Sequence, residues 1–334
     1  MTSLVITIDT EPDNQWTMPV AGRPQPDLAF ANTRGLGRLI DFFQKLDVKA
    51  TWLTSWSVAR DAESARLLRR AAASGDEIGG HLHAWETPPF TPADAQAHPY
   101  IYEYDAETRM AKLRNVTSAI ADAFGAAPVS YRAGRWGIDD RERDNLAELG
   151  YTIDTSVVPG HSFATSRGLL RGGPDFRRHL KSEIDKPYRS GPLWEVPVSV
   201  TTIGLLPSLG AGGLAAYLGR TLSYGNGLVS RAAAKGLRET GLCRMVWIRP
   251  LVHPRSDLVR AAVSMARGGA DVINIMFHSS EAFAGASPRS RTEENVSRLY
   301  DDLSGIVRAL RDSGGVTPLT LRDAVVRHEP PPQR

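Results

Sequence analysis

Short β-branched runs alternate with helical patterns along most of this 334-residue chain, and this alternation restricts the fold more than any other feature. Residues 36–46 have the apolar spacing of one helix face and lead into a strand near 50–54. Helical patterns at 65–73 and 106–124 again precede strand patterns. Further strand candidates lie at 129–132, 151–154, 195–200, 243–248, 272–277 and 316–321. About eight strands that alternate with helices favour an α/β fold, a parallel (β/α) barrel, over a sandwich.

Two stretches break this rhythm and predict added structure on one face of the barrel. Residues 86–105 contain four prolines and several aromatic side chains, which predicts a long loop over that face. Residues 158–240 are rich in Gly, Pro and Arg and then helical, which predicts an insertion, with a small separate lid domain as the alternative. We therefore expect one barrel domain over residues 1–326 and a disordered tail at 327–334.

Charge and composition exclude several classes of protein. The formal net charge is only +3 and no Lys/Arg block is interleaved with aromatics, so we expect no nucleic-acid partner. No apolar run reaches the length of a membrane helix. The single cysteine, Cys243, has apolar neighbours and is expected in the core rather than as a nucleophile. The chain begins a strand within a few residues, without a basic region or a long apolar stretch, which predicts a cytoplasmic protein.

Two pairs of polar side chains follow strand patterns at the spacing i, i+2. Asp9 and Glu11 end the apolar run at 4–8, and His81 and His83 end a second short run. Residues two apart on a strand point to the same side, so each pair can reach one site. Taken alone, each pair is explained equally well without a metal site. Asp9 and Glu11 would then be strand-end turn residues, and the two histidines polar loop groups. Two carboxylates together with two imidazoles favour the site of a divalent-metal hydrolase.

Arg132 and His278 also stand at predicted strand ends, which meet on one face of a parallel barrel. Taken alone, an arginine after a strand, such as Arg132 or Arg135, is more often a surface salt-bridge partner. A lone histidine in the setting of His278 is more often a hydrogen-bonded strand-end residue. The two polar pairs on the same face favour catalytic roles instead.

Five short motifs then occur in an order that resembles the polysaccharide deacetylase family, also called the NodB homology or carbohydrate esterase family 4 group. The motifs lie at residues 7–11, 49–52, 75–81, 131–135 and 275–278. The resemblance covers about residues 1–156 and 243–325, with the insertion between them. It implies a distorted (β/α) barrel and the metal-dependent removal of an acyl group from an amide nitrogen, usually on an N-acetylated sugar.

The resemblance also implies a role for four residues. Asp9 takes the position of the family's catalytic base, and Arg132 that of the arginine that orients this base. His81 takes the position of a metal ligand, and His278 that of the catalytic acid.

The chain departs from the family pattern at the metal ligands. The second carboxylate of the first motif is Glu11, whereas the family often has an Asp directly after the base. The family's second metal histidine usually lies four residues after the first, and this position is Trp85 here. His83 or Glu86 must therefore supply the remaining ligand.

A further departure concerns the group that orients the acid histidine. The family's Asp-Trp motif would fall on residues 157–158, which are both Val. Asp154 and Glu281 are the candidates to replace it.

The strand spacing of the two pairs predicts one divalent ion bound by Glu11, His81 and His83, with zinc as the preferred metal. Asp9 is an additional candidate ligand. An ion held by one carboxylate and two imidazoles keeps a position for water and lowers the water's pKa to about 7. We expect Asp9 to accept a proton from that water and His278 to protonate the departing amine.

These expectations define a metal-dependent N-deacetylase. Its expected substrate is a small molecule or an oligosaccharide that contains an N-acetylated amino sugar. Another amide hydrolysis on the same scaffold, such as deformylation or the opening of a cyclic ureide, is the first alternative. A non-catalytic carbohydrate-binding protein is the second.

Overall fold

The computed structural model describes residues 1–16, 28–91, 94, 98–166, 172–177, 185–209, 218 and 228–328. Its strands are β1 (Thr2–Thr10), β2 (Thr51–Thr54), β3 (Glu77–Leu82), β4 (Ser130–Ala133), β5 (Ile153–Asp154), β6 (Tyr188–Ser190), β7 (Leu193–Glu195), β8 (Val200–Ile203), β9 (Arg244–Trp247), β10 (Val272–His278) and β11 (Val316–Leu319). Its α-helices are α1 (Ala31–Arg34), α2 (Gly37–Lys45), α3 (Trp56–Arg60), α4 (Ala62–Ala73), α5 (Ala106–Phe124), α6 (Asp140–Glu148), α7 (Leu205–Ser208), α9 (Leu228–Glu239), α10 (Arg255–Arg267), α11 (Glu293–Ser313) and α12 (Leu321–Val326). Short 3₁₀ turns are η1 (Asp13–Trp16), η3 (Ile101–Glu103), η4 (Gly134–Trp136) and η6 (Ser279–Ala282).

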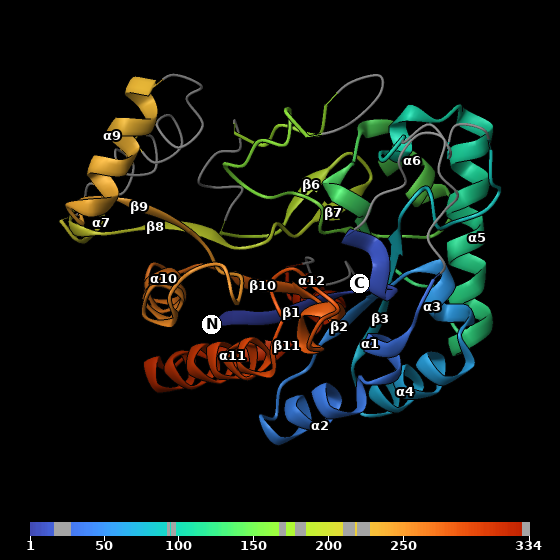
Figure 1. Ribbon diagram of the computed structural model, residues 1–334, viewed down its shortest axis with the longest axis horizontal. Helices are drawn as coiled ribbons and strands as arrows, with labels where there is room; N and C mark the ends of the chain where they lie inside the picture. The colour runs from blue at the N-terminus through green and yellow to red at the C-terminus, as the bar shows by residue number, and fades with distance from the viewer. Residues whose placement is uncertain are drawn as a thin grey trace, which may run out of the picture.

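Nine of these strands form one curled sheet in the order β10-β1-β2-β3-β4-β5-β7-β6, with β11 beside β1 (Figure 1). Every pairing in this sheet is parallel except that of β6 with β7. Beyond β7, the backbone N–H of Ser199 donates to the carbonyl of Asn274 on β10 at 2.9 Å, which links the two sides of the curl. The predicted α/β fold with a distorted, mostly parallel barrel is confirmed.

Residues of β1 alternate between the two faces of the sheet, as the period of a strand requires. Leu4 and Ile6 belong to the outer core, which helices α2, α4, α10 and α11 cover (Figure 1). Val5 belongs to a smaller cluster with side chains of α12. The next alternate residues are Thr7 and Asp9, and both contact the buried guanidinium of Arg132. This face of the sheet is therefore apolar near the start of β1 and polar near its end.

Capping residues define where several helices of the outer layer begin and end. Asp61, Asp105 and Thr292 accept a backbone N–H from the first turn of α4, α5 and α11 respectively. Helix α5 ends at Gly125, whose φ of 80° is the left-handed conformation that glycine favours. The helices expected before residue 125 correspond to α2, α4 and α5.

The second half of the chain differs from the expected repeat. The strand expected at 195–200 is divided, because β7 ends at Glu195 in the barrel sheet and β8 begins at Val200. Strand β8 pairs with β9 in a separate antiparallel sheet, and this ribbon extends away from the barrel toward α7 and α9 (Figure 1). The region expected as an insertion at 158–240 thus also supplies β6 and β7 to the barrel sheet. Residues 329–334 of the expected tail lie outside the described residues, and the proposed domain boundaries stay predictions.

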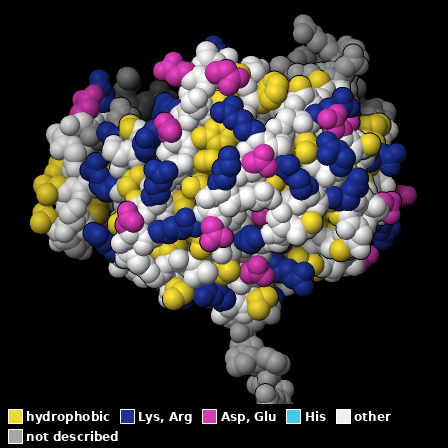
Figure 2. Space-filling model, turned by 90° about the horizontal axis from the view of Figure 1, so that it is seen from below, with side chains coloured by type: hydrophobic (Ala, Val, Ile, Leu, Met, Phe, Trp, Pro, Cys, Tyr) yellow, Lys and Arg dark blue, Asp and Glu magenta, His cyan; other side chains and the backbone are white. Residues whose placement is uncertain are grey.

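The described helices, one face of the surface and Cys243 bear on the expectations from composition. None of the described helices combines the length and the apolar character needed to cross a membrane. Figure 2 shows the underside of the molecule, where Lys and Arg side chains are interspersed with Asp and Glu. Cys243 is buried, as expected.

Candidate active site

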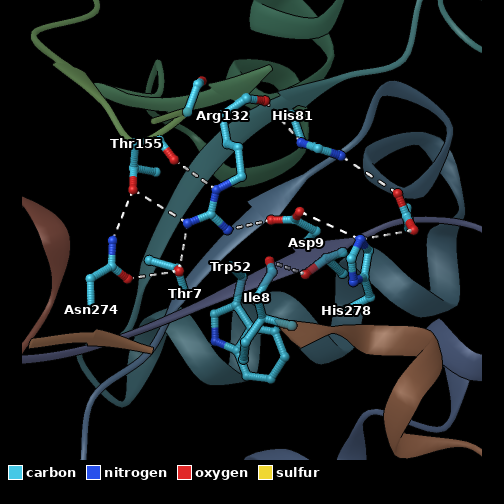
Figure 3. Close-up of polar contacts among 12 residues, drawn as sticks. Thr7, Ile8, Asp9, Trp52, His81, Arg132, Thr155, Asn274 and His278 are labelled. Carbon is cyan, nitrogen blue, oxygen red and sulfur yellow. Dashed lines mark hydrogen bonds and ion pairs between the residues drawn. The ribbon is translucent and has the colours of Figure 1, made fainter. Parts of the chain in front are cut away.

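The parallel register brings the predicted site residues to one edge of the sheet. Asp9 on β1 is the register partner of His278 on β10, and His81 on β3 is that of Arg132 on β4. Figure 3 shows these four side chains converging from their separate strands. The sequence prediction that they share one face therefore agrees with the geometry, while their chemical roles stay predictions.

Glu11, His81 and His83 form a buried group of possible metal ligands. The Glu11 Oε2 atom lies 2.7 Å from His83 Nε2 and 3.5 Å from His81 Nε2, and the two Nε2 atoms are 3.1 Å apart. His81 Nδ1 lies 2.9 Å from the carbonyl oxygen of Arg132. Because a carbonyl only accepts, Nδ1 carries the hydrogen and the Nε2 lone pair is left for a ligand bond.

This donor set fits a divalent ion. Neighbouring ligands at about 2.1 Å from one ion lie roughly 3 Å apart, close to the separations seen here. One carboxylate and two imidazoles suit zinc and several other divalent metals. The three side chains therefore form a candidate metal site.

Glu86, the alternative third ligand, lies in a different environment. Its Oε1 atom accepts hydrogen bonds from Ser55 Oγ at 2.7 Å and from the backbone N–H of Ser57 at 3.0 Å, at the start of α3. Trp85 instead donates its indole N–H to Gln15 at 2.8 Å and lies beside the His83 ring. The geometry favours His83 over Glu86.

Asp9 and Arg132 form a buried ion pair at the base of the site. Arg132 Nη1 lies 2.5 Å from Asp9 Oδ1, and Arg132 is fully buried. The guanidinium also donates to Thr7 Oγ1 at 2.7 Å and to the carbonyl of Thr155 at 2.9 Å (Figure 3). Burial alone would raise the pKa of Asp9, but the Arg132 and His81 charges outweigh it and lower that pKa. Asp9 is therefore ionised near neutral pH.

His278 lies between the carboxylates and an arginine that the sequence interpretation missed. Its Nε2 atom is 3.7 Å from Asp9 Oδ2 and 3.9 Å from Glu11 Oε1. On the other side of the ring, Arg249 Nη2 lies 2.9 Å from Nδ1 and 2.7 Å from Glu281 Oε1. Burial, together with the Arg249 charge, lowers the pKa of His278 against the opposing effect of Glu11. Arg249 directly follows the expected strand at 243–248, so the strand-end signal that identified Arg132 was also present here.

The two candidates to orient His278 differ in their placement. The carboxylate of Glu281 lies 3.9 Å from His278 Nδ1 and shares Arg249 with it. Asp154 instead accepts a hydrogen bond from Ser156 at 2.5 Å and lies 3.6 Å from Arg143 Nε. Asp154 therefore does not hold His278.

Asp9, His278 and the three candidate metal ligands line a cavity of about 190 Å³, whereas Arg132 lies outside its lining. Trp85, Tyr100, Trp136 and Phe163 also line it, as does Arg135. Aromatic rings beside charged groups can stack on the apolar face of a sugar while the polar groups bind its hydroxyls.

Comparison with known proteins agrees with this fold. Residues 4–153 match the model of the polysaccharide deacetylase family, so the chain carries a polysaccharide deacetylase family domain over this range. Among characterised proteins, Chitin deacetylase 1 of Cryptococcus neoformans is 29% identical over 140 residues, a match that spans 40% of this chain and 27% of that protein. This chain therefore corresponds to only about a quarter of that relative's length.

Two solved structures share the fold at low identity. A protein designated a polysaccharide deacetylase from Mycobacterium smegmatis aligns with a TM-score of 0.54 at 16% identity, over 98% of this chain and 89% of that chain. A 4-alpha-glucanotransferase from Thermococcus litoralis aligns with a TM-score of 0.53 at 9% identity, over 98% of this chain and 40% of that chain. At these identities the likeness concerns the fold alone.

Proposed function

We propose that this protein is a metal-dependent amide hydrolase that removes the N-acetyl group from an amino-sugar-containing substrate. The convergence of Glu11, His81 and His83 in a cavity that Asp9 and His278 also line carries this proposal. The family domain over residues 4–153 supports it.

The chain's own residues account for the proton transfers. An ion held by Glu11, His81 and His83 would polarise the substrate carbonyl and make a water molecule acidic enough to attack near neutral pH. Asp9 accepts a proton from the attacking water, and Arg132 keeps its carboxylate ionised between turnovers. Protonated on both ring nitrogens, His278 would deliver the Nε2 proton to the departing amine nitrogen and become neutral, and Asp9, 3.7 Å away, can then pass on the proton that it took from the water.

Acetate release and metal content test this function together. We expect purified protein to bind one divalent ion and to release acetate from N-acetylglucosamine or its short oligomers. Chelation should abolish release, and added zinc or another divalent ion should restore it. Release of formate in preference to acetate from matched amides would favour the alternative amide hydrolysis. Tight binding of the sugars by metal-free protein, without release of any acyl group, would contradict the hydrolase proposal.

A further inference from the structure

Arg135 is an arginine of the cavity wall that lacks an acidic partner among the described residues. No ion pair between described residues includes it, and its buried Nε atom has no hydrogen-bond partner. Its guanidinium carbon lies 5.7 Å from the centre of the Tyr100 ring, which is within the range of a cation–π contact. The other two arginines of the site differ, because Arg132 pairs with Asp9 and Arg249 with Glu281. Arg135 thus holds at least one buried N–H donor with no acceptor among the described residues.

The backbone places this side chain at the cost of local strain. Arg135 and Trp136 have φ values of 55° and 65°, a left-handed conformation that is strained for both residue types. Gly134 lets the turn approach the site, since a Cβ there would lie 2.3 Å from the Leu82 carbonyl and 2.6 Å from His83 Nδ1. The turn η4 is therefore pressed against the candidate metal ligand His83. Strained positions of this kind concentrate at functional sites.

The charges of the cavity favour a negatively charged ligand group beside Arg135. Arg132 and Arg249 are each balanced by a carboxylate, and the Glu11 charge faces the candidate metal site. With a divalent ion in place, the charged groups around the cavity would sum to a net positive charge. Arg135 would contribute a guanidinium that is not paired with a carboxylate and can form a forked pair of hydrogen bonds. Guanidinium groups bind carboxylates and phosphoryl groups in this geometry.

We propose that Arg135 binds an anionic group, a carboxylate or a phosphoryl, on the N-acylated substrate. This inference rests on the proposed function for the identity of the acyl compound, but the anion subsite itself rests on Arg135. It assigns the substrate to the acidic amino sugars, such as a sugar phosphate or a sugar acid. A neutral sugar would leave the buried Nε–H of Arg135 without an acceptor.

Matched pairs of charged and neutral sugars test this preference. N-acetylglucosamine 1-phosphate is compared with methyl N-acetylglucosaminide, and N-acetylmuramic acid with its methyl ester. In one of the two pairs we expect kcat/KM to be at least about tenfold higher for the charged sugar than for its neutral partner. The pair that shows this preference identifies the anionic group that Arg135 binds as a phosphoryl or a carboxylate. The Arg135→Gln variant should reduce that ratio to near one, mainly through KM, and Arg135→Lys should retain part of it.

Controls separate local binding from general charge and from loss of fold. Arg66 on α4 is exposed, so Arg66→Gln removes the same charge away from the cavity and should leave the ratio unchanged. Thermal unfolding should show that both variants fold. Equal kcat/KM for charged and neutral sugars in the wild-type protein, or an equal loss of preference in Arg66→Gln, would overturn the proposal.

A binding measurement distinguishes this inference from the proposed function. In an Asp9→Asn background, calorimetry should show the charged sugar binding at least about tenfold more tightly than its neutral partner, and the added Arg135→Gln change should remove the difference. If this binding pattern appears but wild-type protein releases no acetate, the anion subsite stands and the deacetylase proposal fails. If acetate is released without any Arg135-dependent preference in binding or kinetics, the anion subsite fails and the deacetylase proposal stands.

Discussion

Arg249 donates a hydrogen bond from Nη2 to Nδ1 of His278 across 2.9 Å, and this contact fixes the position of the ring proton. An arginine has no acceptor, so Nδ1 must offer its lone pair and the hydrogen of neutral His278 lies on Nε2. That nitrogen faces Asp9 and Glu11. Glu281 in turn holds Arg249 at 2.7 Å, so a chain of two buried charges sets the tautomer of neutral His278. The ring acts as an acid only after it takes up a second proton, and Glu281, 3.9 Å from Nδ1, is the acceptor that faces this second N–H.

Loss of this contact should lower the rate through His278. We expect Arg249→Gln to reduce kcat by about tenfold or more, because the ring then loses the contact that orients it toward Asp9 and Glu11. In the His278→Ala background the same change should add little, since residues that act as a unit are not additive. A double-mutant cycle on kcat measures this. Additive losses would show that Arg249 acts on something other than His278.

The role of His278 itself can be tested by comparing substrates that have different leaving groups. His278→Ala should reduce turnover of an N-acetylated amine strongly, by roughly 10² to 10⁴, because an amine leaves only when protonated. An activated acetyl ester needs no such proton, so its turnover should fall much less. Parallel assays of both substrates provide the measurement. Equal losses on both would argue against an acid role.

Metal content should follow the side chains that converge in the cavity. His81→Ala should lose tightly bound divalent metal, and His83→Ala should bind it at least tenfold more weakly, since each removes one of three ligands. Glu86→Gln is the matched control, because its carboxylate contacts Ser55 and Ser57 instead. Elemental analysis after dialysis against a weak chelator measures the occupancy. A full equivalent of metal in His81→Ala would refute the assignment.

Asp9→Asn separates proton transfer from structure. The amide keeps the shape of the carboxylate beside Arg132 but accepts no proton, so we expect turnover to fall by about 10² or more while bound metal is retained. Acetate release and metal analysis on the same preparation test this. Activity close to that of the wild-type protein would remove Asp9 from the role of base.

The placement of the site residues at strand ends could be predicted from the sequence, because parallel pairing brings the ends of neighbouring strands to the same edge of the sheet. An apolar strand followed by polar residues predicts both the sheet and its functional edge, and Asp9, His81, Arg132 and His278 all obey that rule. Arg249 obeys it too, but β9 lies outside the barrel sheet, so the regular repeat did not predict its approach to His278.

Other parts of the site depend on long-range packing that local patterns do not encode. The division of residues 195–200 into β7 and β8 follows from the pairing of β8 with β9, a partner more than 40 residues away. The left-handed backbone at Arg135 follows Gly134, which lies close to His83, and arginine itself gives no signal for this conformation. Zinc as the ion and the cytoplasmic location stay predictions.

Glu142 gives the fold a pH dependence that is separate from the active site. Its carboxyl group is buried and accepts a hydrogen bond from the Tyr131 hydroxyl at 3.0 Å. Burial raises its pKa from 4.5 to about 8 in the folded protein, although the Arg109 charge opposes the shift. Between pH 4.5 and about 8 the unfolded chain releases this proton while the folded protein keeps it. The free energy of unfolding should therefore fall as the pH rises through this window, by up to about 1.4 kcal/mol per unit from this group.

Glu142→Gln should remove this contribution, because the amide has nearly the same shape and does not titrate. We expect the unfolding free energy of the variant, measured in urea from pH 5 to pH 8, to decline less steeply than that of the wild-type protein. The difference between the two proteins should level off above pH 8, where the folded carboxyl group also ionises. Glu148 is exposed on the same helix, so Glu148→Gln should leave the pH dependence unchanged. Parallel curves for Glu142→Gln and the wild-type protein would show that Glu142 is not protonated in the folded state at neutral pH.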